Sequence, residues 1–161
     1  MEHLINWNTF AAIATALGVL VGANQMRQNG KLAQSAFEDT LDQQYRNLSM
    51  EIPVDALIGK DVSQSQKDKT RECIYNYLDL SNEQCFIRKK GRVTPDTWND
   101  WCTGIKANLG KPAFKVVWDE VKSEAPGTFS FLEKLENLDF NSDPRTWAKV
   151  TFFSRYFRNE K

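Results

Sequence analysis

The sequence predicts an all-α protein in which a single N-terminal transmembrane helix precedes a bundle-like soluble domain of about five helices. Three observations predict this fold. Residues 10–23 carry no charge and are mostly apolar. Elsewhere, apolar side chains recur at three- and four-residue steps, which is the period of an α-helix. No hairpin turn joins two alternating segments, as paired strands would require. The predicted domains are a membrane anchor over residues 1–30 and a cytoplasmic helical domain over residues 31–161.

The composition is that of a globular protein that can bury a core. Apolar residues make up 41% of the 161 positions and charged residues 26%, which argues against disorder. The 21 basic residues equal the 21 acidic ones, so no overall field predicts binding to duplex nucleic acid. Cys73, Cys85 and Cys102 lack metal or redox spacing and are predicted to be buried, unpaired thiols.

The uncharged run from Phe10 to Ala23 is predicted to enter a membrane. Its fourteen residues also fit a core helix, so the flanking residues decide. Trp7 lies where an interfacial aromatic belongs, and Arg27 and Lys31 follow the run. The charge asymmetry predicts an outside N-terminus, and the absence of a leading basic residue disfavours a secretory signal.

Gly18 and Gly22 form a G-x-x-x-G pattern within this run. Small residues at this spacing let two helices approach closely in a bilayer. We therefore predict that these two glycines pack against another helix, either in a homo-oligomer or in a membrane-protein partner.

The next segment is predicted to be an amphipathic helix that ends near Met50. Its apolar residues recur from Leu32 to Leu48, and Asn29-Gly30 marks a kink or break before them. Pro53 ends the helix, and Gly59 closes a short turn after it.

Local signals then mark the boundaries of the remaining helices. A helix starting near a Ser65–Asp68 capping box runs to Lys90, with Gly91 as its stop. Thr94-Pro95 begins the next helix, which ends before Pro112. Three further helices are predicted over residues 112–125, 128–138 and 144–157.

No catalytic, metal-binding or cofactor-binding pattern is present. The sole histidine is His3, which leaves no Ser–His or Cys–His pair and few options for zinc. The glycines lack the spacing of a phosphate loop. The sequence therefore predicts a protein that is not an enzyme and takes no cofactor.

The most distinctive local feature is a basic turn composed of Arg88, Lys89, Lys90 and Arg92. Cations at the C-terminus of a helix meet its macrodipole favourably, which explains part of this clustering. The turn is also a candidate anion- or ligand-binding site for lipid headgroups or a phosphorylated small ligand. A second basic cluster follows in the last predicted helix and comprises Arg145, Lys149, Arg155, Arg158 and Lys161.

Several of these segments resemble a group of uncharacterised bacterial proteins. The resemblance rests on Q-x-R-x-N at Gln25–Asn29, on the S-N-E motif beginning at Ser81, and on W-x-x-W at Trp98–Trp101. It implies an N-terminal membrane helix with a small helical cytoplasmic domain, and hence a single-pass protein of the bacterial inner membrane. It implies no substrate.

Three functions are consistent with the sequence. The first is a non-enzymatic, membrane-anchored interaction module that is a homo-oligomer or an accessory subunit of a membrane assembly. The second is a ligand-gated membrane effector of prokaryotic antiviral defence whose cytoplasmic domain binds a cyclic nucleotide or an oligonucleotide. The third is a soluble helical enzyme or binding protein whose first helix belongs to the core.

Overall fold

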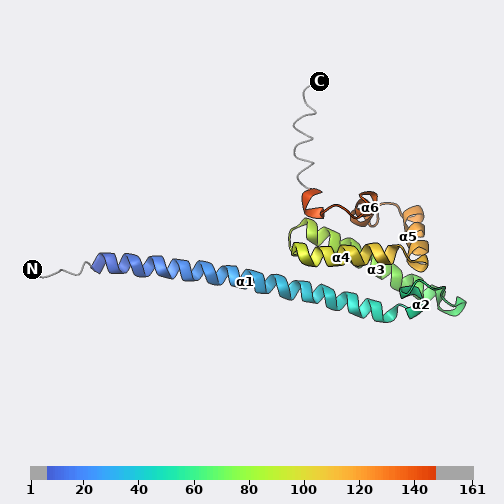
Figure 1. Ribbon diagram of the computed structural model, residues 1–161, viewed down its shortest axis with the longest axis horizontal. Coiled ribbons are helices and arrows are strands. Elements are labelled where there is room, and N and C mark those ends of the chain that lie inside the picture. Colours follow the sequence, from blue (N-terminus) through green and yellow to red (C-terminus); the bar gives the residue numbers. More distant parts are fainter. Residues whose placement is uncertain (1–6, 148–161) are drawn as a thin grey trace, which may run out of the picture. The chain divides into compact units, whose positions relative to one another are not determined.

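A computed structural model describes residues 7–147 of the protein, and these residues fold into helices joined by turns (Figure 1). No strand occurs among them, which confirms the all-α class. The chain divides into two compact units, Met1–Asp39 and Thr40–Lys161. The division falls inside a helix and not at Gly30, where the predicted anchor ends.

The described part of the first unit belongs to α1 (Trp7–Glu51). The helix runs through Asn29-Gly30 without interruption, so the break predicted there is wrong. A single glycine lowers the stability of a helix by only about 1 kcal/mol. The helix-forming residues on both sides of it can offset this loss. Within residues 7–147, no helix is both long enough and apolar enough to cross a membrane, and the transmembrane helix stays a prediction.

The second unit contains the end of α1 and every other described element. These elements are α2 (Val54–Leu57), η1 (Gln64–Gln66), α3 (Lys67–Lys89), α4 (Pro95–Leu109), α5 (Pro112–Glu124), α6 (Ser130–Asn137) and η2 (Pro144–Thr146). The helix predicted over residues 144–157 begins as η2, and its remainder lies outside the described residues.

The core of this unit is built around α3, which contacts α4, α5, α6 and η2. Ile74 and Leu78 of α3 are fully buried, as are Phe114 of α5 and Leu132 of α6. Each such side chain contributes roughly 1.5–3 kcal/mol by leaving water. The packing of α3 therefore fixes where both of its ends lie within the unit.

The last turns of α1 pack against the rest of this unit. Leu41 is buried, and the Trp101 indole of α4 donates to a carboxylate oxygen of Asp42 at 2.8 Å. The ring of Tyr45 lies 6.2 Å from that of Tyr77. Leu32, at the start of the predicted amphipathic stripe, is exposed.

Most helix boundaries follow the predicted signals. The Thr94 hydroxyl accepts from the backbone N–H of Thr97 at 3.2 Å, which is the expected cap of α4. The Ser65–Asp68 capping box is wrong, because the 3-10 turn η1 includes Ser65 and delays α3 to Lys67. Ser63 donates to the Gln66 side chain there instead, at 2.8 Å.

Candidate functional site

The basic turn begins where α3 ends at a glycine in the left-handed conformation. Gly91 has a φ of +72°, and its N–H donates to the carbonyl of Arg88 at 2.9 Å. The N–H of Arg92 donates to the carbonyl of Ile87 at 3.2 Å. These two bonds form a Schellman motif, which satisfies carbonyls that the helix leaves open.

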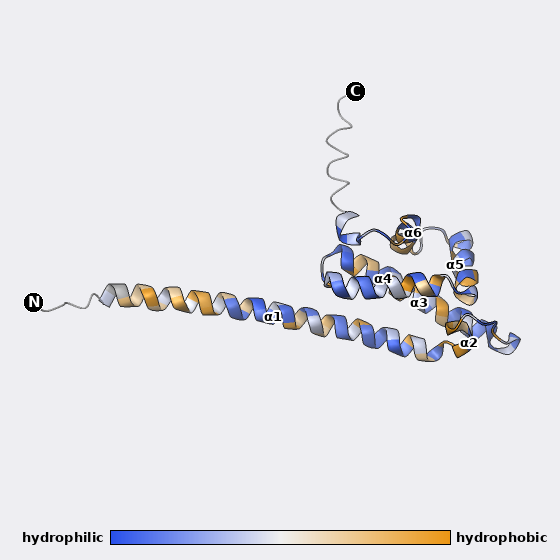
Figure 2. Cartoon of the chain, in the orientation of Figure 1, coloured by the Kyte–Doolittle hydropathy of each residue, from blue (hydrophilic) through white to orange (hydrophobic). Residues whose placement is uncertain are grey.

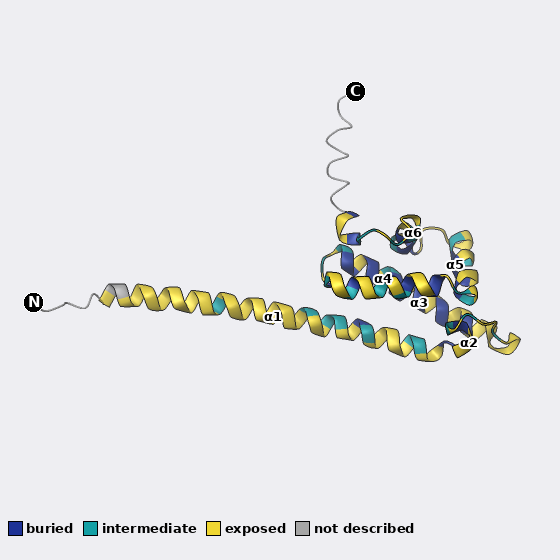
Figure 3. Ribbon diagram, in the orientation of Figure 1, coloured by how far each residue is buried: buried dark blue, intermediate teal, exposed yellow. Residues whose placement is uncertain are grey.

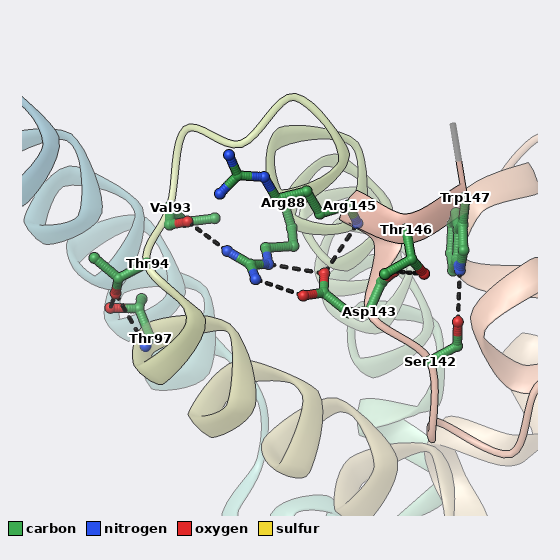
Figure 4. A network of polar contacts seen from close by, with 9 residues as sticks. All are labelled: Arg88, Val93, Thr94, Thr97, Ser142, Asp143, Arg145, Thr146 and Trp147. Atoms are coloured by element: carbon green, nitrogen blue, oxygen red, sulfur yellow. Dashed lines mark hydrogen bonds and ion pairs between the residues drawn. The ribbon is translucent and has the colours of Figure 1, made fainter. Parts of the chain in front are cut away.

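Arg88 points away from the solvent and is clamped by polar partners (Figure 4). Its Nε and Nη2 donate to the two carboxylate oxygens of Asp143, at 2.9 and 2.5 Å. Its Nη1 donates to the carbonyl of Val93 at 2.8 Å. The Arg88 side chain is only 3% exposed. The prediction that Arg88 belongs to an accessible anion site is therefore wrong, because its guanidinium is buried and already paired.

The sequence carries a signal for this burial. Arg88 follows Cys85 by three residues and Ser81 by seven, and both of those side chains are fully buried. Residues at these spacings share one face of a helix. Helical spacing does not identify the ion-pair partner of Arg88, because Asp143 lies 55 residues further along the chain.

Asp143 has a second role as the cap of η2. The carboxylate accepts from the backbone N–H of Arg145 at 2.9 Å in addition to its bonds with Arg88. Burial alone would raise the pKa of Asp143, but the hydrogen bonds and charges of Arg88 and Arg145 outweigh it and lower the pKa. The carboxylate is thus held ionised, and it joins the end of α3 to the 142–147 segment.

The bonds of Asp143 with Arg88 and with the Arg145 N–H place Arg145 beside the basic turn. A Cβ atom placed on Gly91 would lie 3.4 Å from the Cζ and 3.4 Å from the Nε atom of Arg145. Figure 4 shows the Arg145 side chain reaching from η2 toward this turn. By sequence, Arg145 belongs to the C-terminal basic cluster, whose other members lie outside the described residues.

The other basic residues of the turn lie over or beside aromatic rings. The ammonium of Lys89 is 4.8 Å from the ring centre of Phe131, and that of Lys90 is 5.3 Å from the ring centre of Phe86. The two rings are 5.5 Å apart. Lys90 and Arg92 are exposed, and Lys89 is half-buried.

A different feature occupies the N-terminal half of α1. Its large apolar side chains are exposed on all sides of the helix, and the uncharged stretch is the most apolar part of α1 (Figures 2 and 3). The exposed residues include Trp7, Phe10, Ile13, Leu17, Val19, Leu20 and Val21. Gly18 and Gly22 lie in this stretch, and a Cβ at either position would meet open space.

A shallow groove of about 710 Å³ lies along α3 and α5. Apolar atoms of Ile74, Val116 and Val117 line it, and a bidentate ion pair between Arg71 and Glu120 crosses it. Arg71 and Glu120 thus satisfy each other's charge within the groove.

Between residues 7 and 147, no cluster of histidine, cysteine and carboxylate side chains could hold a metal ion. All three cysteines are free and buried, and burial raises the pKa of each thiol. The features that remain are an apolar helix surface and a basic turn. Comparison with protein-family models, with curated proteins and with solved structures finds no match to this chain.

Proposed function

We propose that the protein is a non-enzymatic, membrane-attached helical interaction module. The N-terminal half of α1 would insert into a lipid bilayer, and the helical unit that starts at Thr40 would engage other molecules. The observation that carries the proposal is the exposed apolar stretch from Phe10 to Ala23. Such a surface in water would promote aggregation unless lipid or protein covered it.

The energetics favour insertion over a water-exposed helix. Leu17 and Leu20 are 57% and 66% exposed, and each such side chain gains roughly 1.5–3 kcal/mol when it is fully buried. The helix also satisfies its own backbone hydrogen bonds, which is the main requirement for entering lipid. Because apolar side chains surround the stretch, a helix lying flat on the surface would leave one side in water.

The length of the stretch limits how it inserts. Fourteen residues rise about 21 Å, whereas the hydrocarbon core is about 30 Å thick. The flanking residues would therefore reach into the headgroup region, where Trp7 and Arg27 are favourable. Packing against a second copy through Gly18 and Gly22 would further cover the short helix, so we include homo-oligomerisation in the proposal.

The ligand-gated effector receives less support from the same unit. Arg88 is one of its four candidate ligand residues, and the guanidinium of that residue is already bound to Asp143 and Val93. We therefore favour the interaction module.

The test is flotation of the full-length protein with vesicles of phosphatidylcholine. We expect the wild type to float with the lipid and a Leu17→Asp/Leu20→Asp variant to stay at the bottom. A matched control, Ile58→Asp/Val116→Asp, also loses two exposed apolar side chains but lies outside α1, and it should float normally. A wild type that purifies as a soluble monomer without detergent and ignores the vesicles would refute membrane attachment.

A further inference from the structure

We infer that Lys90, Arg92 and Arg145 together form a site for the phosphate groups of anionic lipid headgroups. This inference rests on the proposed membrane attachment and names the lipid chemistry that the helical unit would recognise. It differs from the basic turn predicted by sequence. Arg88 is buried and Lys89 lies half-buried over the Phe131 ring, so both are left out, and Arg145 is added.

The site unites side chains from two distant parts of the chain. Lys90 and Arg92 lie at the end of α3, and Arg145 comes from η2 and contacts Gly91. Hydrogen bonds hold the two parts together, because Asp143 binds the Arg88 guanidinium on one side and the Arg145 N–H on the other. Arg88 and Asp143 are thus positioning residues, and they keep three cations at one turn.

The helix macrodipole does not explain the whole cluster. It stabilises the positive charges of Lys90 and Arg92, which follow the end of α3. Arg145 belongs to another element, so its place beside Gly91 brings a further positive charge to a position where like charges repel. Within residues 7–147, no carboxylate forms an ion pair with Lys89, Lys90, Arg92 or the Arg145 side chain. A bound anion would relieve this repulsion.

The surrounding aromatic rings favour a lipid headgroup over a soluble phosphate. Phe86 is 39% exposed beside Lys90, and its ring packs against Phe131. Aromatic rings beside long basic side chains are favourable at the membrane–water boundary, where the rings meet apolar material and the cations meet phosphate. A soluble phosphate would gain nothing from the rings.

The experiment compares binding of the full-length protein to two kinds of vesicle. One contains phosphatidylcholine alone, and the other contains phosphatidylcholine mixed with phosphatidylglycerol. We expect tighter binding to the mixed vesicles, and we expect Lys90→Gln/Arg92→Gln/Arg145→Gln to remove this difference. Since each of the three basic side chains near an anionic surface is worth about 1 kcal/mol, the loss should be roughly a hundredfold.

The control variant, Lys60→Gln/Lys69→Gln/Lys115→Gln, removes the same number of exposed positive charges at other places. It should keep the preference for the mixed vesicles. If both triple variants lose the preference equally, total charge and not a site explains the binding, and the inference is wrong. Circular dichroism of each variant checks that the fold is retained.

The outcomes also separate this inference from the proposed function and from a soluble ligand. No binding to pure phosphatidylcholine would refute attachment through α1, whereas equal binding of the wild type to both vesicles would refute only the lipid site. Glycerol phosphate should compete no better than sodium chloride at equal ionic strength. Specific competition by glycerol phosphate would show that the turn binds free phosphate and would overturn the lipid assignment.

Discussion

At the scale of single residues, burial decides what a basic side chain can do. Arg88 and Lys90 are two positions apart, and on an α-helix this separation turns the side chains by about 200°. Arg88 therefore faces the core, where Asp143 neutralises it, and Lys90 faces the solvent. Two basic residues of the same run therefore differ in role: Arg88 stabilises the fold, and Lys90 is available to bind a ligand.

The Arg88–Asp143 pair predicts an asymmetric response to mutation. Asp143→Ala should lower the free energy of unfolding by about 3–5 kcal/mol, because it leaves a buried guanidinium without its counter-charge. Arg88→Met should cost less, because the Asp143 carboxylate is 35% exposed and can regain water. Urea denaturation measures both values. Asp119→Ala removes an exposed ion pair with Lys122 and should change stability by less than about 1 kcal/mol.

The lowered pKa of Asp143 also predicts a pH dependence. A carboxyl whose pKa is lower in the folded than in the unfolded protein adds stability at higher pH, and this stability is lost as the pH falls through the folded pKa. The free energy of unfolding should therefore decline below about pH 4, the range of an ordinary aspartate. Asp143→Asn should show a shallower decline. An unchanged acid slope would mean that the pair is not formed in solution.

At the scale of elements, α3 ends through a backbone geometry that most residues avoid. Gly91 combines a positive φ with close contact from Arg145, so this position both stops the helix and leaves room for the guanidinium. The glycine was predicted as a stop from the sequence alone. The contact with Arg145 depends on tertiary packing and could not be predicted.

Two glycine substitutions should therefore have opposite effects. Gly91→Ala should destabilise the protein by about 1–2 kcal/mol, because a Cβ is strained at this φ. Gly104→Ala, inside α4 with open space around it, should stabilise by about 0.5–1 kcal/mol. Thermal melting of the two variants gives the comparison. Equal shifts in the same direction would contradict the left-handed helix end.

At the scale of the whole molecule, the sequence predicted the helix boundaries better than the contacts between distant residues. Thr94, Gly91 and Pro112 mark helix ends by effects that act within a few residues, and each lies where predicted. The limit of the second unit within α1 was not predicted, because Leu41 is buried and Leu32 is exposed although both belong to the same predicted apolar stripe. Likewise, the basic site needed the pairing of residues 88 and 143, which no local pattern contains.

The unit boundary leads to a final prediction about independent folding. Every buried apolar residue of the described chain lies at or after Leu41, so a fragment of residues 40–161 should unfold cooperatively with nearly the stability of the full chain. A fragment of residues 53–161 should be several kcal/mol less stable. It loses the buried side chains of Leu41 and Ile52, worth roughly 1.5–3 kcal/mol each, and the bond from Trp101 to Asp42. Urea midpoints of the two fragments test this, and equal stabilities would show that the last turns of α1 do not belong to the core.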